Sequence, residues 1–366
     1  MKGIKKILAL VVASTISFTM VSCGSKNNKG KSELSDTIVV TTKYPNDVMK
    51  QISEEFKKET GITVKYTLKD EITESDFKDS NIDVIVGGAK ELYNEMTSKG
   101  MLKPYKTSWF DEVDDNLRDK NGNWYSIFKN PIVVAYNKTN LPASFIPTKL
   151  QDLEGGKVSN KLVMTNSDNY YTKYFISATA SYLTSISNND EKVGNLFLQN
   201  LKLNVASFYN NYDEVIKALN TKETPIGIVP LDILNKNIKN NPNLTKVSIT
   251  DGEPTVDECA GILKSTTHEN AADMFMEFIA GPKVQLELAQ KFNIIPTLPV
   301  ALKYSPDWIK NFKPMNVSEQ VILDNENKWV QYFNGVVKPE TAKSKTVLSS
   351  TISDAKNTNK NVKKDK

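Results

Sequence analysis

The length, composition and charge of the chain exclude several classes of protein. Its 366 residues exceed what one hydrophobic core of about 250 residues usually serves, so we expect two lobes. A hydrophobic fraction of 39%, a charged fraction of 25% and a mean hydropathy of −0.41 are typical of a globular chain that neither spans a membrane along its length nor stays unfolded. The formal charge of the chain is +4, and the ends contribute all of its positive excess. The three lysines before Ile7, a charge of +2 over residues 24–35 and a charge of +3 from Ser350 onward leave a charge of −4 on the body. An acidic body does not favour binding to nucleic acid.

The first residues have the pattern of a secretory signal. Three lysines precede an uncharged apolar run from Ile7 to Phe18, and these roughly 12 residues are too few for a membrane-spanning helix of ~20. The segment Met20 to Gly24 (MVSCG) follows and resembles the lipobox of bacterial lipoproteins. This resemblance implies cleavage before Cys23, acylation of its thiol and anchoring at the extracellular face of the cell membrane. An ordinary secreted protein with an accidental Cys23 is the alternative.

The two ends of the mature chain differ from its body. We expect residues 1–22 to be the signal peptide, 23–35 a lipidated flexible tether and 346–366 a disordered, Lys-rich tail, because both flanking segments offer little apolar surface to bury. Cys259 is the only other cysteine, so the mature domain has no internal disulfide, and we expect its side chain to be buried.

Strands and helices alternate from the start of the body. Residues 37–41 form a β-branched run that predicts a strand, and apolar residues three and four apart over 48–56 predict a helix that ends at Gly61. A strand over 62–66 completes a βαβ unit. Residues 82–86 predict the next strand, followed by two glycines and a helix that reaches Gly100. Such units predict a parallel sheet covered by helices.

The later elements continue this pattern and suggest two crossings between lobes. Residues 124–127 and 132–137 predict two strands, of which the second crosses between the lobes. Further strands are expected at 162–164, 204–207 and 225–229, with helices between them. A return crossing near 246–250 leads to a strand at 260–264, and helices after Glu269, Gly281 and Val317 complete the expected fold.

Several stretches of the sequence resemble one known family. They are EFKKETGI from Glu55, DVIVGGAKELYNEMTSKGMLKPY from Asp83, WYSIFKNPIVVAYN from Trp124, IGIV from Ile226, TDG from Thr250 and AADMFMEFIAGPKVQLEL from Ala271. In this order and spacing, over about residues 36–299, they are similar to the bacterial extracellular solute-binding proteins of ABC importers, in the branch of ferric iron, phosphonate and sugar-phosphate binders.

The resemblance implies an α/β, two-lobed periplasmic-binding-protein-like (type II) fold. Each lobe would hold a central, mostly parallel sheet flanked by helices, and two hinge strands would join the lobes. We expect the first lobe to comprise residues 36–134 and 256–345, with the C-terminal helices, and the second lobe 135–255. The implied partners are a small-molecule ligand in the cleft and the permease and ATPase subunits of the importer. We expect a monomer that has no catalytic activity and no cofactor.

Candidate ligand contacts in the first lobe follow two predicted strands. Tyr44 comes just after the first strand, either in a plain turn or facing the ligand. Gly87, Gly88 and Ala89 follow a later strand, where glycines allow a close backbone approach and the next N–H groups can bind an anion. A merely tight turn is the alternative for these glycines.

Candidate contacts in the second lobe gather around the start of a predicted helix. Asn166, Tyr170, Tyr171 and Thr172 stand where many relatives have a Ser- and Gly-rich anion-binding turn, and Thr172 is the best match. The tyrosines would either cover a flat portion of the ligand or pack against the opposite lobe. Tyr209, after a later strand, adds a candidate hydroxyl donor.

Two acidic residues and the possibility of iron complete the candidate site. Asp232 and Glu258 match positions where sugar-phosphate-binding relatives place carboxylates on hydroxyls, and a surface charge or helix cap is the alternative. Ferric-binding relatives commonly place adjacent tyrosines where this chain has Pro230 to Asp232, so iron ranks below an organic anion, with Tyr170 and Tyr171 as its possible ligands.

These residues rank the ligand classes and exclude common enzymes. A phosphate or phosphonate that carries hydroxyl or amine groups comes first, ferric iron second, and thiamine-like or polyamine cations third. The only histidine, His268, is expected at the surface, and the sequence has no GxSxG, HExxH, CxxC or P-loop motif. A lipid-anchored surface enzyme or adhesin is therefore the weaker alternative class.

Overall fold

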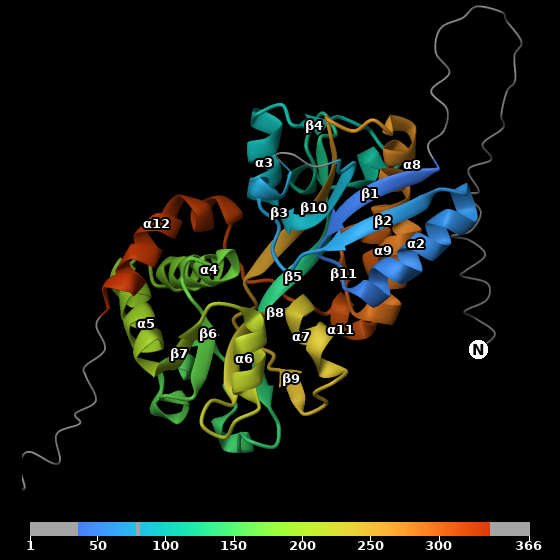
Figure 1. Ribbon diagram of the computed structural model, residues 1–366. Helices are drawn as coiled ribbons and strands as arrows, with labels where there is room; N and C mark the ends of the chain where they lie inside the picture. The colour runs from blue at the N-terminus through green and yellow to red at the C-terminus, as the bar shows by residue number, and fades with distance from the viewer. Residues whose placement is uncertain (1–35, 78–80, 337–366) are drawn as a thin grey trace, which may run out of the picture.

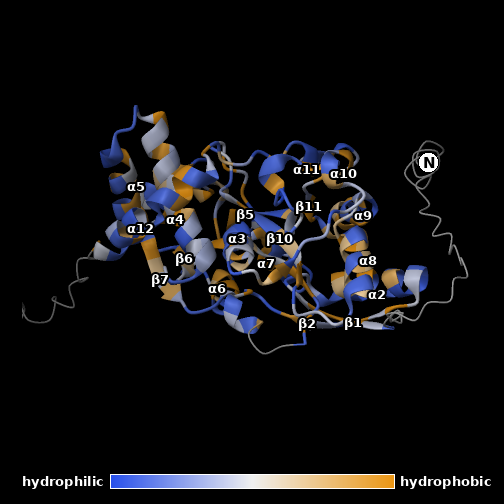
Figure 2. Ribbon diagram, turned by 90° about the horizontal axis from the view of Figure 1, so that it is seen from above, coloured by the Kyte–Doolittle hydropathy of each residue, from blue (hydrophilic) through white to orange (hydrophobic). Residues whose placement is uncertain are grey.

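The computed structural model describes residues 36–77 and 81–336. The expected signal peptide, Cys23, the tether and the tail from 346 lie outside the described residues. Within the described part the chain folds into two lobes, and two long strands run between them (Figure 1). In Figure 2 hydrophobic and hydrophilic stretches alternate along the surrounding helices, as expected for helices that cover a sheet on one side only.

The first lobe contains both the start of the described chain and a later part of it. Its elements are β1 (Thr37–Thr42), α2 (Asn46–Thr60), β2 (Thr63–Leu68), β3 (Val84–Ala89), α3 (Lys90–Ser98), β4 (Leu102–Lys103), α8 (Glu269–Ile279), α9 (Pro282–Phe292) and β11 (Ile295–Pro296). The predicted first βαβ unit is confirmed, because β1 pairs in parallel with both β2 and β3. Gly61, at φ 80°, ends α2 in the left-handed conformation that its position predicted.

The second lobe is built from the middle of the chain. Its elements are β6 (Leu162–Thr165), α4 (Tyr170–Ile186), α5 (Glu191–Asn204), β7 (Val205–Tyr209), α6 (Tyr212–Leu219), β8 (Ile226–Pro230), α7 (Leu231–Ile238) and β9 (Leu244–Lys246). Here β6 pairs in parallel with β7 and β8.

Short 3₁₀ turns occur in the connections between strands. They lie at Glu74–Asp76, Phe110–Glu112, Asp115–Leu117, Ala143–Phe145, Leu150–Glu154 and Gly156–Val158.

Two long strands connect the lobes. β5 (Trp124–Asn137) pairs with β10 (Thr255–Leu263) over its first half and with β8 over its second half, both antiparallel. The sequence predicted two strands here, and the structure joins them into one. Pro131 has no N–H to donate, but the ladder continues because the next residue, Ile132, donates its N–H to the Pro254 carbonyl at 2.7 Å. The parallel parts of the sheet thus meet through antiparallel hinge strands, in the order β2-β1-β3-β10-β5-β8-β6-β7.

The C-terminal helices return across the lobe boundary. They are α10 (Pro299–Lys303), α11 (Asp307–Lys310) and α12 (Glu319–Gly335). α12 lies beside α4 and α5 of the second lobe (Figure 1), and its Trp329 is buried and donates to Ser181 in α4. The expected lobe boundaries remain predictions. They assigned α12 to the first lobe, whereas in the structure this helix packs on the second lobe.

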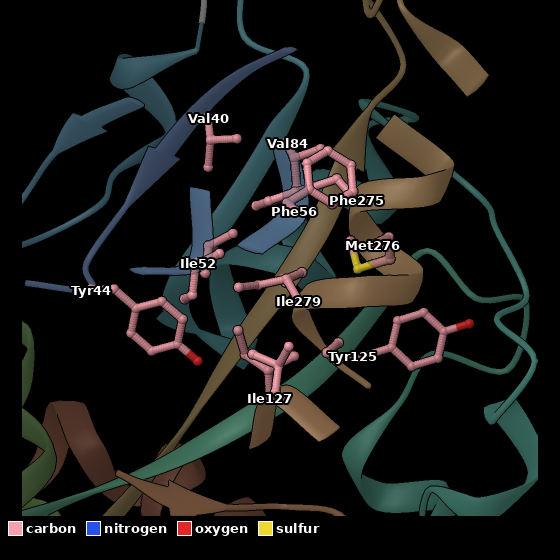
Figure 3. Close-up of a cluster of buried hydrophobic side chains, with 14 of the residues drawn as sticks. Val40, Tyr44, Ile52, Phe56, Val84, Tyr125, Ile127, Phe275, Met276 and Ile279 are labelled. Carbon is pink, nitrogen blue, oxygen red and sulfur yellow. The ribbon is translucent and has the colours of Figure 1, made fainter. Parts of the chain in front are cut away.

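Each lobe has its own hydrophobic core. In the first lobe, Phe56 of α2 packs edge-on against Phe275 of α8 with ring centroids 5.1 Å apart. Figure 3 shows this cluster, with Tyr44 at its margin and Ile127 of β5 below. The second lobe has a separate cluster around α4 and β6. Tyr44 lies in the short connection between β1 and α2, and its buried side chain packs into the core of the first lobe.

Candidate ligand-binding site between the lobes

A buried lysine lies at the centre of the contacts between the lobes. Lys43 directly follows β1, and only 2% of its side chain is exposed. Its Nζ lies 2.8 Å from Glu258 Oε1 on β10 and 3.5 Å from Asp232 Oδ2 in the first turn of α7. It also donates to the hydroxyl of Tyr171 in α4. One ammonium group of the first lobe thus connects a hinge strand with two helices of the second lobe.

Glu258 accepts hydrogen bonds from four donors, and its side chain has no exposed surface. Its Oε1 accepts from Lys43, from Asn130 Nδ2 at 3.1 Å and from the Tyr171 hydroxyl, and its Oε2 accepts from the Gly88 N–H at 2.5 Å. The sequence suggested that the Gly88 amide would bind an anionic ligand. In the structure the carboxylate of Glu258 is the anion that this amide binds.

The electrostatics of the cluster favour positive charge. Burial lowers the pKa of Lys43, but the attraction of Asp232 and Glu258 and its hydrogen bonds to them outweigh burial and raise it. Burial and the negative charge of Glu258 likewise raise the pKa of Tyr44. Because one ammonium faces two carboxylates, the three groups have a formal charge of −1.

Two buried polar atoms beside this cluster have no hydrogen-bond partner among the described residues. One is the hydroxyl of Tyr44, whose ring packs against Phe128 with centroids 5.0 Å apart. The other is Glu91 Oε1, while Glu91 Oε2 accepts from the Tyr170 hydroxyl at 2.7 Å. An unpartnered buried polar group is costly, so such atoms are candidates for contact with a bound molecule.

The start of α4 is organised by its own side chains. Asn169 caps the helix, since its Oδ1 accepts from the backbone N–H groups of Tyr171 and Thr172 and from the Tyr212 hydroxyl at 2.8 Å. The Thr172 hydroxyl is buried and bonded to that of Thr165 at 2.5 Å. The expected anion-binding turn is thus occupied by hydrogen bonds within the chain.

Of the remaining predicted site residues, Gly87 contacts the cluster, whereas Asn166 bonds to residues outside it. Ala89 directly precedes α3, and Gly87 lies against the stem of Lys43. Asn166 donates its backbone N–H to the Tyr209 carbonyl at 2.8 Å and its side chain to Asn210, away from Lys43. Both tyrosines of the 170–171 pair contact the opposite lobe, which was one of the two roles proposed for them.

Polar contacts at more exposed positions also join the lobes. They are Asp70 with Lys236 at 3.0 Å, Glu71 with Asn169 at 3.4 Å, Asp47 with Lys239, and Lys90 with Glu319 at the start of α12. Most of these side chains are partly exposed, so each contributes little by itself. The buried Lys43 cluster is the stronger contact between the lobes.

Candidate residues away from the Lys43 cluster have structural explanations. His268 precedes α8, and its Nδ1 lies 3.0 Å from Asp83 Oδ2, a buried carboxylate that also accepts from Thr266. It is 35% exposed, so it is a partly buried partner of Asp83 rather than a plain surface residue. Cys259 is buried, as expected. Over residues 36–77 and 81–336, no three His, Cys, Asp or Glu side chains are grouped to hold a metal ion, and no helix has the length and hydrophobicity to span a membrane.

Sequence reasoning did not single out Lys43, Asn130 or Glu91 as site residues. Lys43 directly follows β1 in a loop, residues 43–45, that was expected to face the ligand, and this position was the signal that could have found it. Asn130 and Glu91 gave no comparable signal, because each is polar within an otherwise ordinary strand or helix.

A two-lobed α/β fold with hinge strands and a buried polar cluster between the lobes is typical of binding proteins. The family model described as bacterial extracellular solute-binding protein matches residues 79–319, more than half of the chain. The chain therefore belongs to the bacterial extracellular solute-binding proteins, and its predicted relation to the solute-binding proteins of ABC transporters is confirmed. Members of this family are transport proteins that bind a small molecule outside the cytoplasm.

Individual relatives are distant in sequence. A probable ABC transporter periplasmic-binding protein of Sinorhizobium fredii is 23% identical over 257 residues, covering 68% of this chain and 71% of the relative. The ferric ion-binding protein A of Pasteurella haemolytica superposes with a TM-score of 0.66 at 16% identity, covering 82% of this chain and 98% of that one. AfuA of Actinobacillus pleuropneumoniae, solved with fructose 6-phosphate, gives 0.63 at 16%, with 82% and 99% covered. These structures confirm the type II fold, and at such identity they carry no ligand assignment.

Proposed function

We propose that this protein is the substrate-binding component of an ABC importer and that it captures a small polar solute in the cleft between its lobes. The proposed solute has a phosphate or phosphonate group at one end and ammonium or hydroxyl groups at the other. The observation that carries this proposal is the buried cluster of Lys43, Glu258 and Asp232, which holds both signs of charge within 3.5 Å. The anionic end would pair with Lys43, and the donor end with the two carboxylates.

Neighbouring groups support a solute with both donors and acceptors. The Tyr44 hydroxyl offers a buried donor, and Glu91 Oε1 offers a buried acceptor. Because the cluster itself has a formal charge of −1, a simple anion such as inorganic phosphate would meet repulsion, and a zwitterion would meet less. The protein would act by binding and release, with closure driven by the preference of the solute for the closed form, and without catalysis.

Thermal unfolding tests this function. The full chain, carrying Cys23→Ser to prevent acylation, is melted with 2-aminoethylphosphonate, glucose 6-phosphate, inorganic phosphate and putrescine. A solute at one hundred times its Kd adds ~2.7 kcal/mol to stability, or a rise in Tm of about 5 °C. We expect 2-aminoethylphosphonate to raise Tm more than phosphate or putrescine does. If none of the phosphate compounds shifts Tm, the ligand assignment is wrong.

A ferric-iron receptor is the second candidate, and one observation favours it. The Tyr171 hydroxyl, Glu258 and Asp232 gather hard oxygen atoms around a cation, which Fe³⁺ prefers as ligands. Titration with ferric citrate would then produce the visible absorption of an iron–tyrosinate bond, which Tyr171→Phe should abolish and Tyr170→Phe should weaken. We rank this candidate lower because Lys43 lies in the centre of those oxygen atoms.

We also propose that Cys23 carries the acyl chains that hold the protein, as a monomer, at the extracellular face of the cell membrane. This rests on the lipobox-like segment before Cys23, which lies outside the described residues. Two or more acyl chains anchor a protein stably, at about 0.8 kcal/mol for each buried methylene. Labelled palmitate should enter the wild-type chain and not Cys23→Ser, and the variant should leave the membrane fraction. Equal labelling of both would contradict the anchor.

A further inference from the structure

The fold makes a specific place for the side chain of Lys43. Its backbone N–H donates to the Val86 carbonyl at 2.9 Å, which fixes the residue to β3. Its stem crosses Gly87, where an added Cβ would lie 2.8 Å from Lys43 Cβ and 3.0 Å from its Cγ. Gly87 also has a φ of +99°, which other residues rarely adopt. The absent side chain at Gly87 therefore lets the lysine stem pass close to β3 and reach Glu258 and Asp232.

The ammonium end of Lys43 is enclosed as a bound amine would be. A primary ammonium has three N–H donors, and here three acceptors surround it: Glu258 Oε1 at 2.8 Å, Asp232 Oδ2 at 3.5 Å and the Tyr171 hydroxyl. This geometry suits an alkylammonium group from any source.

The same contacts hold the lobes together. Glu258 is tied to the first lobe by the Gly88 N–H, whereas Asp232 and Tyr171 belong to helices of the second lobe. The side chains of Lys43 and Glu258 are at most 2% exposed, so a solute can reach them only when the lobes part. Without the lysine charge, two carboxylates would face each other across the cleft and repel.

We propose that Glu258, Asp232 and Tyr171 form a subsite for a primary ammonium group, which Lys43 fills to hold the lobes closed until the solute exchanges for it. The ammonium of the solute would take the place of the lysine, and Lys43 would turn to the anionic group of the solute. Charge balance in the subsite is then preserved, because one ammonium replaces another. This inference rests on the proposed function, in that the cleft is taken as the solute site.

Chemical rescue of Lys43→Ala tests the subsite. Alanine keeps Cβ and removes three carbons and the ammonium, so n-propylammonium supplies the missing atoms. We expect the solute-free variant to have a lower Tm and, in small-angle X-ray scattering, a larger radius of gyration than the wild type. Millimolar n-propylammonium should raise the Tm of the variant by about 5 °C and reduce its radius, with no effect on the wild type.

Two control compounds separate charge from packing. We expect n-propanol, which has the chain without the charge, and tetramethylammonium, which has the charge without N–H donors, to leave the Tm of Lys43→Ala unchanged. The proposal is overturned if n-propylammonium fails to raise the Tm of the variant, or if it raises variant and wild type equally.

A second variant covers the case in which Lys43→Ala does not fold. Lys43→Met keeps an apolar stem beside Gly87 and removes the ammonium group with its charge and N–H donors. We expect it to fold and to show a larger radius of gyration than the wild type, and an unchanged radius overturns the proposal. Neither experiment uses a transported solute. If only the ammonium subsite is wrong, n-propylammonium fails to rescue Lys43→Ala, but phosphonates still raise the Tm of the wild type. If only the proposed function is wrong, phosphonates leave the Tm of the wild type unchanged, but n-propylammonium still rescues Lys43→Ala.

Discussion

The substitution Glu258→Gln tests how much the buried cluster stabilises the closed protein. Glutamine has nearly the shape of glutamate, but its amide nitrogen cannot accept a hydrogen bond. In the wild type both carboxylate oxygens accept, one from the Gly88 N–H at 2.5 Å and the other from Lys43 at 2.8 Å. In the variant one of these donors must face an NH₂ group, and Lys43 keeps only Asp232, at 3.5 Å, as its anionic partner.

The magnitude follows from the cost of an uncompensated buried charge. Removing one partner of a buried ion pair typically costs about 3–5 kcal/mol. With about 2 °C per kcal/mol for a chain of this size, Tm should fall by roughly 6–10 °C. Urea unfolding of the same samples would check that the free energy of unfolding in water changes, while its dependence on urea concentration (the m-value) does not.

The matched control is Glu59→Gln, which makes the same chemical change in a solvent-exposed ion pair. The side chains of Glu59 and Lys283 are 46% and 56% exposed, so the loss should be at most about 1 kcal/mol. If Glu258→Gln lowers Tm by no more than Glu59→Gln does, the buried cluster does not stabilise the closed protein and the reasoning is refuted.

Four further predictions concern neighbouring features. Gly87→Ala should lower Tm more than Gly88→Ala, since both have φ above +90° but only the first places a Cβ 2.8 Å from Lys43. Tyr170→Phe should cost about 1–3 kcal/mol in urea unfolding, because it leaves a second oxygen of the Glu91 carboxylate unpartnered. Cys259, whose thiol pKa is raised by burial, should react with a disulfide reagent only after unfolding. The stability that Lys43 adds should be complete below the ordinary lysine pKa of about 10.4 and be lost as pH rises through its raised folded pKa.

Each of these predictions has an outcome that contradicts it. Equal Tm values for Gly87→Ala and Gly88→Ala would show that the stem of Lys43 moves aside without cost. An unchanged stability in Tyr170→Phe would mean that solvent replaces the tyrosine hydroxyl. If Cys259 in the folded protein reacts as fast as an exposed thiol, β10 opens readily. For Lys43, the difference in unfolding free energy between wild type and Lys43→Met should persist at neutral pH and shrink only as pH rises through the raised pKa of Lys43, and a loss near pH 7 contradicts the sign.

The order of the elements was predictable because its causes are local. The β-branched run of β1, the three-and-four spacing of the apolar residues in α2 and the glycine at its end lie within a few residues of each other. The parallel pairing of β1 with β2 and β3 followed from the same repeated units. Such patterns, together with the resemblance they support, were sufficient for the class of fold and the class of protein.

The candidate site was predictable as a region but not as a set of contacts. Sequence placed Tyr44, Gly88, Tyr171, Asp232 and Glu258 near strand ends or helix starts, and the structure gathers them at the lobe boundary. The sequence could not show that the Gly88 amide binds a carboxylate of the protein itself. That contact joins residues 170 positions apart in the chain, and no local pattern records it.

The sequence by itself determined the alternation of strands and helices, the two-lobed family fold and the burial of Cys259, since these depend on local spacing, propensity and hydrophobicity. Only the tertiary structure decided that α12 packs on the second lobe, that β5 continues through Pro131, and that Lys43 reaches Glu258 from 215 positions away. The physical reason is that a buried charge is stable only where folding brings its counter-charges from distant segments, and that meeting depends on topology rather than on neighbouring residues.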